Sequence, residues 1–149
     1  MAKRRKPARP KRESGCPISF ALGIFGDRWS LLVLRDLILK GRRRYKELVA
    51  AEEGIATNIL SDRLSRLEEH GLIVREPDEK DRRQVLYRPT EIAVDLIPML
   101  VELIVWGAHN DPDTAVRDEF VAQFEEDRDA LIALIVKQVE STRRHGQRG

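Results

Sequence analysis

The sequence predicts a mainly α-helical fold of the α+β class, with one two-stranded β-hairpin and long helices towards its C-terminal end. Three observations lead to this prediction. Residues 55–72 carry leucines at helical spacing, two β-type segments follow with a polar turn between them, and the stretches after Thr90 are long and apolar. Two short helices joined at a glycine and followed by a hairpin predict a winged helix-turn-helix, in which the hairpin is the wing.

The stretch IATNILSDRLSRLEEHGL has two different faces when it is drawn as a helix. Leu60, Leu64 and Leu67 form one apolar stripe, and Gly71 suits the helix end. Small polar and basic residues occupy the remaining surface, which suits a helix that lies in the DNA major groove. An ordinary amphipathic surface helix explains the same pattern. The polar positions are Asn58, Ser61, Asp62, Ser65 and Arg66.

Two helices are expected before this stretch, and a third leads into it. Cys16-Pro17 opens a short apolar helix that ends at Gly26, because proline fits a first helical position. Asp27 is a natural N-cap for a second helix, residues 28–40, which is apolar nearly all round and is expected to lie in the core. The segment RRRYKELVAAEEG forms a short helix that ends at Gly54.

The predicted hairpin pairs LIVRE with QVLYR across the turn PDEKDRR. Lys80, Arg82 and Arg83 lie at its tip or just past it, where they would reach phosphates or an adjacent minor groove. A solvated polar turn is the alternative, because the acidic residues of the same turn offset this positive charge.

The sequence after Thr90 predicts helices whose apolar surface must be buried against another part of the protein. Thr90-Glu91 is expected to cap one long helix, IAVDLIPMLVELIVWG, that is kinked at Pro98. Its apolar surface is more than a small domain covers, so a second copy of the chain is expected to pack there. A further helical segment spans residues 114–142, where EEDRD either bends or divides it. The candidate dimer residues are Leu96, Leu100, Leu103, Ile104 and Trp106.

Composition narrows the class of protein. The chain has 149 residues and a net charge of +2, but residues 1–13 alone carry +6 and the remainder carries −4. We expect this tail to be disordered and either attracted to polyanions or merely solubilising. The single cysteine excludes an internal disulfide and a cysteine-based zinc site. No apolar run is long enough to cross a bilayer, so a cytoplasmic protein without cofactor or metal is expected.

Two other functional classes compete with DNA binding. The histidines, His70, His109 and His145, are scattered, and no glycine-rich phosphate loop follows a strand, so the chain is not expected to be an enzyme. The stronger alternative is a winged-helix protein-interaction module that does not read DNA. Such a module would use its apolar C-terminal helices as the working surface.

Several motifs occur in a fixed order: CPI, GDRWSLLVLRDL, RYKELVA, IATNILSDRLSRLEEHGLI and LYRPTEIAVDLIPMLVELIVWG. Together they resemble the HxlR-type winged helix-turn-helix transcriptional regulators over residues 16–110. The turn DEKDRRQ is more similar to the wing of MarR-type regulators. The expected domain layout is a basic tail at 1–13, an HxlR-type domain with its dimer helix at 14–110, and a helical extension, also expected to dimerise, at 111–149. The tail and the extension lie outside the resemblance.

The resemblance implies a cytoplasmic homodimer that binds a near-palindromic operator in double-stranded DNA and regulates transcription, as a repressor. Thr57, Asn58, Ser61 and Asp62 would then face the major groove. Arg63, at the edge of the leucine stripe, would anchor a phosphate or pair internally with Glu68 or Glu69. Residues outside this helix would hold the DNA backbone: Arg44 and Lys46 from the preceding helix, and Lys80, Arg82 and Arg83 from the wing.

Cys16 has two interpretations. Some members of this family sense oxidants or electrophiles through a cysteine in the same CP position, and a helix N-terminus favours the thiolate. The alternative is a small apolar residue packed under the first helix. With one cysteine per chain, an oxidised form would be an intersubunit disulfide or a mixed disulfide with a small thiol. A small-molecule or oxidant effector is therefore among the expected partners.

Overall fold

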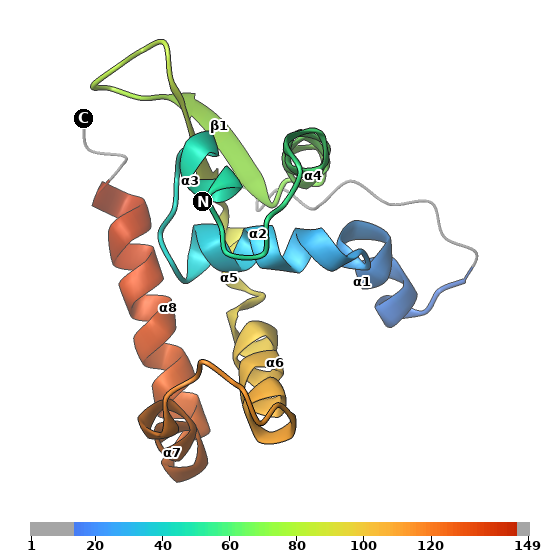
Figure 1. The fold of residues 1–149 in the computed structure, drawn as a ribbon, viewed down its shortest axis with the longest axis vertical. Helices are drawn as coiled ribbons and strands as arrows, with labels where there is room; N and C mark the ends of the chain where they lie inside the picture. The colour runs from blue at the N-terminus through green and yellow to red at the C-terminus, as the bar shows by residue number, and fades with distance from the viewer. Residues whose placement is uncertain (1–13, 146–149) are drawn as a thin grey trace. The chain divides into compact units, whose positions relative to one another are not determined.

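The computed structural model describes residues 14–145, which fall into two units that divide after Ala93. Figure 1 shows the order of the helices and strands. The basic tail at residues 1–13 lies outside the described residues, so its predicted disorder stays a prediction.

The first unit is a winged helix-turn-helix, as predicted. Strands β1 and β2 are antiparallel, with Ile73 opposite Pro89 at one end and Pro77 opposite Val85 at the other. An isolated bridge joins Arg44 to Leu86 and attaches the start of α3 to the wing. The elements are α1 (Pro17–Phe25), α2 (Arg28–Ile38), α3 (Tyr45–Val49), α4 (Thr57–Glu69), β1 (Ile73–Pro77) and β2 (Val85–Pro89).

The core of this unit forms where α2 packs on α4. The predicted leucine stripe of α4 is buried, and Leu60 and Leu67 are fully enclosed. Leu34 and Leu37 of α2 are equally enclosed. Burial of each such side chain contributes roughly 1.5–3 kcal/mol. The stripe therefore fixes which face of α4 turns outward, and β1 lies next to the same helix (Figure 1).

The helix ends follow the expected chemistry with one difference. Asp27 caps α2, because its carboxylate accepts the backbone N–H groups of Trp29 at 2.8 Å and Ser30 at 3.0 Å. Gly54 has a φ of 66°, a left-handed conformation that glycine adopts without strain. However, α3 ends at Val49 rather than next to Gly54, and residues 50–54 form a turn.

The long helix expected from Thr90 is divided into α5 (Glu91–Val94) and α6 (Ile97–Asn110). Pro98 stands in the first turn of α6, where its missing N–H has no helical partner to lose, so it starts a helix instead of kinking one. The hydroxyl of Thr90, the residue expected to cap this helix, donates to the carbonyl oxygen of Gly71 at 2.7 Å and so links the start of α5 back to the end of α4.

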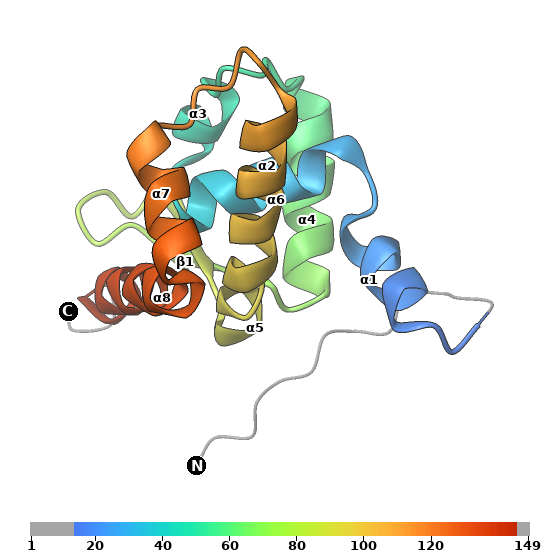
Figure 2. The ribbon, with the colours of Figure 1, turned by 90° about the horizontal axis from the view of Figure 1, so that it is seen from below.

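In the second unit, residues 114–142 contain two helices and not one. They form α7 (Asp118–Glu126) and α8 (Arg128–His145), which run in different directions (Figure 2). Asp127 separates them in an extended conformation, and its carboxylate accepts the N–H of Ala130 at 2.9 Å. The polar run EEDRD therefore divides the segment, because one of its aspartates caps the second helix.

The apolar side chains of α6 differ in exposure. Leu100 is 4 % exposed and belongs to the interior, whereas Leu103 is 47 % exposed and Trp106 is 67 % exposed.

By length and composition alone, the 20 residues Glu91–Asn110 are apolar enough to span a membrane, which corrects the expectation that no run is long enough. The core helix of a soluble protein passes the same test, and a third of this stretch is buried.

Candidate nucleic-acid interface

The outward face of α4 carries the residues that the sequence singled out. Thr57, Asn58, Ser61, Asp62 and Ser65 are all exposed, and the leucine stripe lies on the opposite, buried side. Small side chains of this kind let a helix backbone come close to base edges. Arg63 and Arg66, at the edges of this face, are partly buried.

Arg63 pairs internally, but with other partners than the two glutamates expected from the sequence. Its Nε donates to Asp27 at 2.8 Å, and its Nη1 donates to the neighbouring Asp62. Burial alone would raise the pKa of Asp27, but hydrogen bonds from Ser30, Arg63 and the α2 backbone hold that pKa well below its usual range. Arg63 therefore fastens α4 to the start of α2, and two carboxylates offset its charge.

Tyr45 is a second link to α4, and sequence reasoning assigned it no role at the interface. Its hydroxyl lies 2.8 Å from the carbonyl oxygen of Thr57 and 3.0 Å from the hydroxyl of Ser61. The only signal in the sequence was that Tyr45 shares a face of α3 with apolar residues. Its hydroxyl connects the two helices of the helix-turn-helix at the polar face itself.

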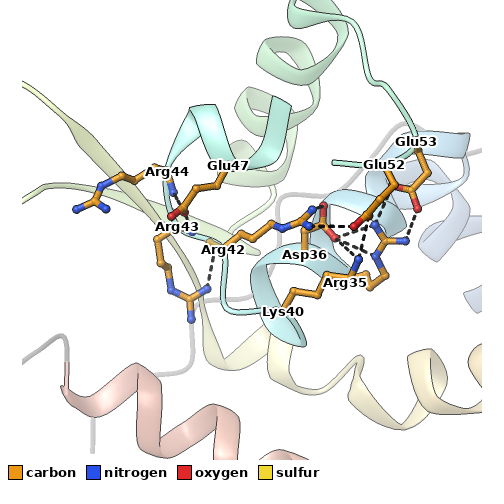
Figure 3. Close-up of polar contacts among 9 residues, drawn as sticks. All are labelled: Arg35, Asp36, Lys40, Arg42, Arg43, Arg44, Glu47, Glu52 and Glu53. Atoms are coloured by element: carbon orange, nitrogen blue, oxygen red, sulfur yellow. Dashed lines mark hydrogen bonds and ion pairs between the residues drawn. The ribbon is translucent and has the colours of Figure 1, made fainter. Parts of the chain in front are cut away.

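A buried aspartate organises the turn between these helices (Figure 3). Asp36 is 3 % exposed and pairs with Arg35 at 2.7 Å and Arg42 at 2.9 Å. Arg35 also holds Glu53 through two hydrogen bonds, of 2.5 and 3.0 Å. This bidentate contact lowers the pKa of Glu53 to about 2. The network ties α2 to the turn at residues 50–54, and no pattern in the sequence indicated it.

Arg44, expected to hold the DNA backbone, lies against the wing instead of standing free. Its guanidinium donates to Asp78 at 2.6 and 3.2 Å, and Asp78 is 3 % exposed. The other oxygen of Asp78 accepts the N–H of Lys80 at 2.9 Å. These bonds hold the pKa of Asp78 below its usual range, mainly through Arg44. Asp78 thus joins the helix-turn-helix to the base of the wing tip.

Exposed cations that the sequence assigned to the DNA backbone lie on α3 and the wing. Lys46, Lys80, Arg82 and Arg83 are exposed, and the side chain of Arg83 is 96 % accessible. The Nε of Arg83 lies 3.8 Å from Asp81, a weak contact at an exposed position. These four side chains are placed to neutralise phosphates.

Cys16 is exposed at the N-cap of α1, and its side chain makes no capping hydrogen bond. The alternative in which it packs as a small apolar residue is therefore not met in this chain. Ile18 and Leu22 on the same helix are also exposed, at 68 and 57 %. Within residues 14–145, no cluster of three or more potential metal ligands occurs.

The chain is similar in sequence to known helix-turn-helix regulators. The sequence profile of the HxlR-like helix-turn-helix family matches residues 24–114. The uncharacterised HTH-type transcriptional regulator Rv3095 of Mycobacterium tuberculosis is 41 % identical over 96 residues, which are 64 % of this chain and 60 % of that protein. The regulator sll1512 of Synechocystis is 37 % identical over 103 residues, covering 68 % of this chain and 76 % of its own length.

Solved structures agree with the fold. PA1607, a proposed transcription factor, superposes with a TM-score of 0.64 at 36 % identity and covers 70 % of this chain and 73 % of its own. The redox regulator HypR in its oxidised form has a TM-score of 0.56 at 27 % identity, covering 66 % of this chain and all of its own. The fold is therefore that of winged-helix transcription regulators.

Proposed function

This chain belongs to the HxlR-like helix-turn-helix family of transcriptional regulators, and from that premise we propose that it represses transcription as a homodimer on a near-palindromic operator. The observation that carries the proposal is the two-sided character of α4. One side is a buried leucine stripe that fixes the helix in the fold. The other presents small polar side chains to solvent at the spacing needed to reach base edges.

Within this proposal the exposed residues divide by role. Asn58 is the candidate for bidentate contact with adenine, because its amide matches the N6 and N7 atoms of that base. Thr57, Ser61, Asp62 and Ser65 complete the reading face, and Arg66 lies at its edge. Lys46, Lys80, Arg82 and Arg83 contact phosphates, which position the protein without selecting a sequence. Arg44 and Arg63 support these contacts from within their ion pairs.

The homodimer is proposed from apolar side chains left at the surface. Leu103 and Trp106 on α6 are exposed, and so are Ile18 and Leu22 on α1. Leu96 and Ile104 are partly exposed, whereas Leu100 lies within the chain and is dropped from the proposed interface. Covering these side chains with a second copy removes apolar area from water, and two-fold symmetry then matches a near-palindromic operator.

Regulation through Cys16 is the third part of the proposal. The thiol is exposed at a helix N-terminus, where an oxidant or electrophile reaches it without unfolding. HypR, a redox regulator, is similar in fold. Oxidation would give a disulfide between two copies or a mixed disulfide with a small thiol, and a reductant would reverse either one.

The test is a titration of the protein against DNA from the promoter beside its own gene, over a series of salt concentrations. Specific binding predicts a retarded complex whose affinity falls steeply with salt, and that exceeds affinity for an unrelated duplex of equal length. An intact dimer that retards no promoter fragment at low salt would favour the protein-interaction module instead. Treatment with diamide before the titration should weaken binding, and Cys16→Ser should abolish that response.

A further inference from the structure

Tyr45 projects from the first turn of α3 and reaches the start of α4 through its hydroxyl group. The oxygen lies 2.8 Å from the carbonyl oxygen of Thr57 and 3.0 Å from the hydroxyl oxygen of Ser61. Thr57 and Ser61 stand one helical turn apart, and both are exposed on the proposed reading face. Tyr45 therefore bonds directly to a side chain that is proposed to contact bases.

The chemistry of the three atoms fixes the direction of both bonds. A carbonyl oxygen only accepts, and a phenol hydroxyl carries one hydrogen, so Tyr45 donates that hydrogen to Thr57. The hydrogen shared between Tyr45 and Ser61 must then come from Ser61. A serine hydroxyl also carries only one hydrogen. Ser61 is left with an available lone pair and no hydrogen to offer to another group.

The direction of these two hydrogen bonds determines which base edges Ser61 can contact in the major groove. The amino groups of adenine and cytosine donate hydrogen bonds there, whereas O4 of thymine and O6 of guanine accept them. A serine hydroxyl that is free to rotate contacts either kind, so it discriminates poorly. A Ser61 whose hydrogen is held by Tyr45 finds a partner only in an amino group.

We infer that Tyr45 is a positioning residue for base selection, which makes Ser61 prefer adenine or cytosine over guanine or thymine on the strand it faces. The inference rests on the proposed function, because it requires α4 to lie in the major groove. Asp62 has the same polarity, since its carboxylate also only accepts and already receives a hydrogen bond from Arg63. The two neighbouring positions thus present acceptors.

The experiment measures base preference at every operator position for the full-length chain. Each protein is incubated with a library of duplexes of randomised sequence, and the bound fraction is recovered and sequenced. The proteins are the wild type, Tyr45→Phe, Ser61→Ala and the double variant. Tyr87→Phe is the matched control, because it removes the chain's other phenol hydroxyl, which lies in the wing.

The wild type should prefer adenine or cytosine by about 3- to 10-fold at one position of each half-site, the range expected for one hydrogen bond. Ser61→Ala should abolish the preference at that position. Tyr45→Phe should bring the four bases close to parity there and leave the other positions unchanged. The double variant should match Ser61→Ala, since Tyr45 acts through Ser61. Tyr87→Phe should keep the wild-type profile.

Three outcomes would overturn the inference. One is an unchanged profile in Tyr45→Phe while Ser61→Ala loses the preference. Another is a wild-type preference for guanine or thymine at the position that Ser61→Ala affects. The third is that the wild type enriches no sequence, which removes the proposed function as well and is thereby distinguished from the first two. Circular dichroism of each variant would show whether a changed profile reflects lost folding.

Discussion

The recognition helix α4 and the wing are both proposed to contact DNA, yet their charges are held differently. Arg63 on α4 is bound by Asp27 and Asp62, and the rest of the outward face is mostly small and uncharged. The wing tip instead presents Lys80, Arg82 and Arg83 to solvent. The difference indicates a division of labour, in which α4 selects the sequence and the wing supplies electrostatic affinity.

The largest effect should come from breaking the proposed dimer, which leaves one α4 and one wing on each DNA-bound molecule instead of two of each. Leu103→Glu places a charge on the proposed interface and should give folded monomers, which lose about half of the binding free energy, roughly 5–7 kcal/mol for a typical specific complex. Sedimentation measures the oligomeric state, and DNA titration measures the binding free energy. Leu100→Glu is the matched contrast, because Leu100 is buried and the same charge there should unfold the chain. A monomeric wild type at micromolar concentration would refute the dimer.

Neutralising the wing should have the next largest effect. Arg82→Ala combined with Arg83→Ala removes four proposed phosphate contacts per dimer. The slope of log K against log salt should become shallower by about 3.6, and affinity at 0.1 M salt should fall by about 3.6 orders of magnitude. Base preferences should stay as they are. Lys137→Ala, at an exposed position of α8, is the control. An unaltered salt slope in the wing variant would contradict the division of labour.

Asp27→Ala should destabilise the domain, because it removes the α2 N-cap and leaves Arg63 without its main partner. We expect a loss of about 2–3 kcal/mol in the free energy of unfolding, measured by urea denaturation. Asp62→Ala removes the other, more exposed partner of Arg63 and should cost less than about 1 kcal/mol. Equal losses in the two variants would show that Arg63 does not fasten α4 through Asp27.

Much of the first unit could be predicted from local pattern. Helical periodicity alone placed Leu60, Leu64 and Leu67 inside, and β-type runs around a polar turn gave the wing. The contacts that shape the reading face were out of reach. Tyr45 and Ser61 are 16 positions apart, and Asp27 and Arg63 are 36 apart. Periodicity assigns a residue to a face of its own helix, but it carries no information about which distant side chain meets that face.

The second unit was predicted less well for a related reason. Leu100 and Leu103 are both apolar residues of one helix, and their spacing does not tell which of them turns inward. A proline such as Pro98 occurs both at a kink within a helix and in the first turn of one, so its presence does not distinguish the two. Sequence pattern alone does not decide the division at Asp127, because an aspartate acts as a cap only where the chain already turns.

A smaller effect is expected at the reading face itself. Asn58→Ala should reduce discrimination between operator and unrelated DNA by about 1–3 kcal/mol, because one bidentate base contact is lost. Affinity for unrelated DNA should change little, since phosphate contacts remain. Competition titrations give both values. Equal losses on both duplexes would mean that Asn58 does not read a base.

The smallest effect concerns pH. The hydrogen bonds from Arg35 lower the pKa of Glu53 from its ordinary 4.5 to about 2, so the folded state favours the ionised carboxylate. Its contribution to stability is therefore complete above pH 4.5 and is lost as the pH falls towards 2. Glu53→Gln should flatten the dependence of the urea midpoint on pH within that window. An unchanged slope there would remove Glu53 from the network that supports the turn before α4.

The proposed homodimer should place two copies of α4 in successive major grooves of one operator. Protection of guanine N7 from dimethyl sulfate tests it most directly, because that atom lies in the major groove. We expect two protected patches separated by about one helical turn, 10–10.5 base pairs. A stable complex on the same fragment with every N7 as reactive as in free DNA would contradict it.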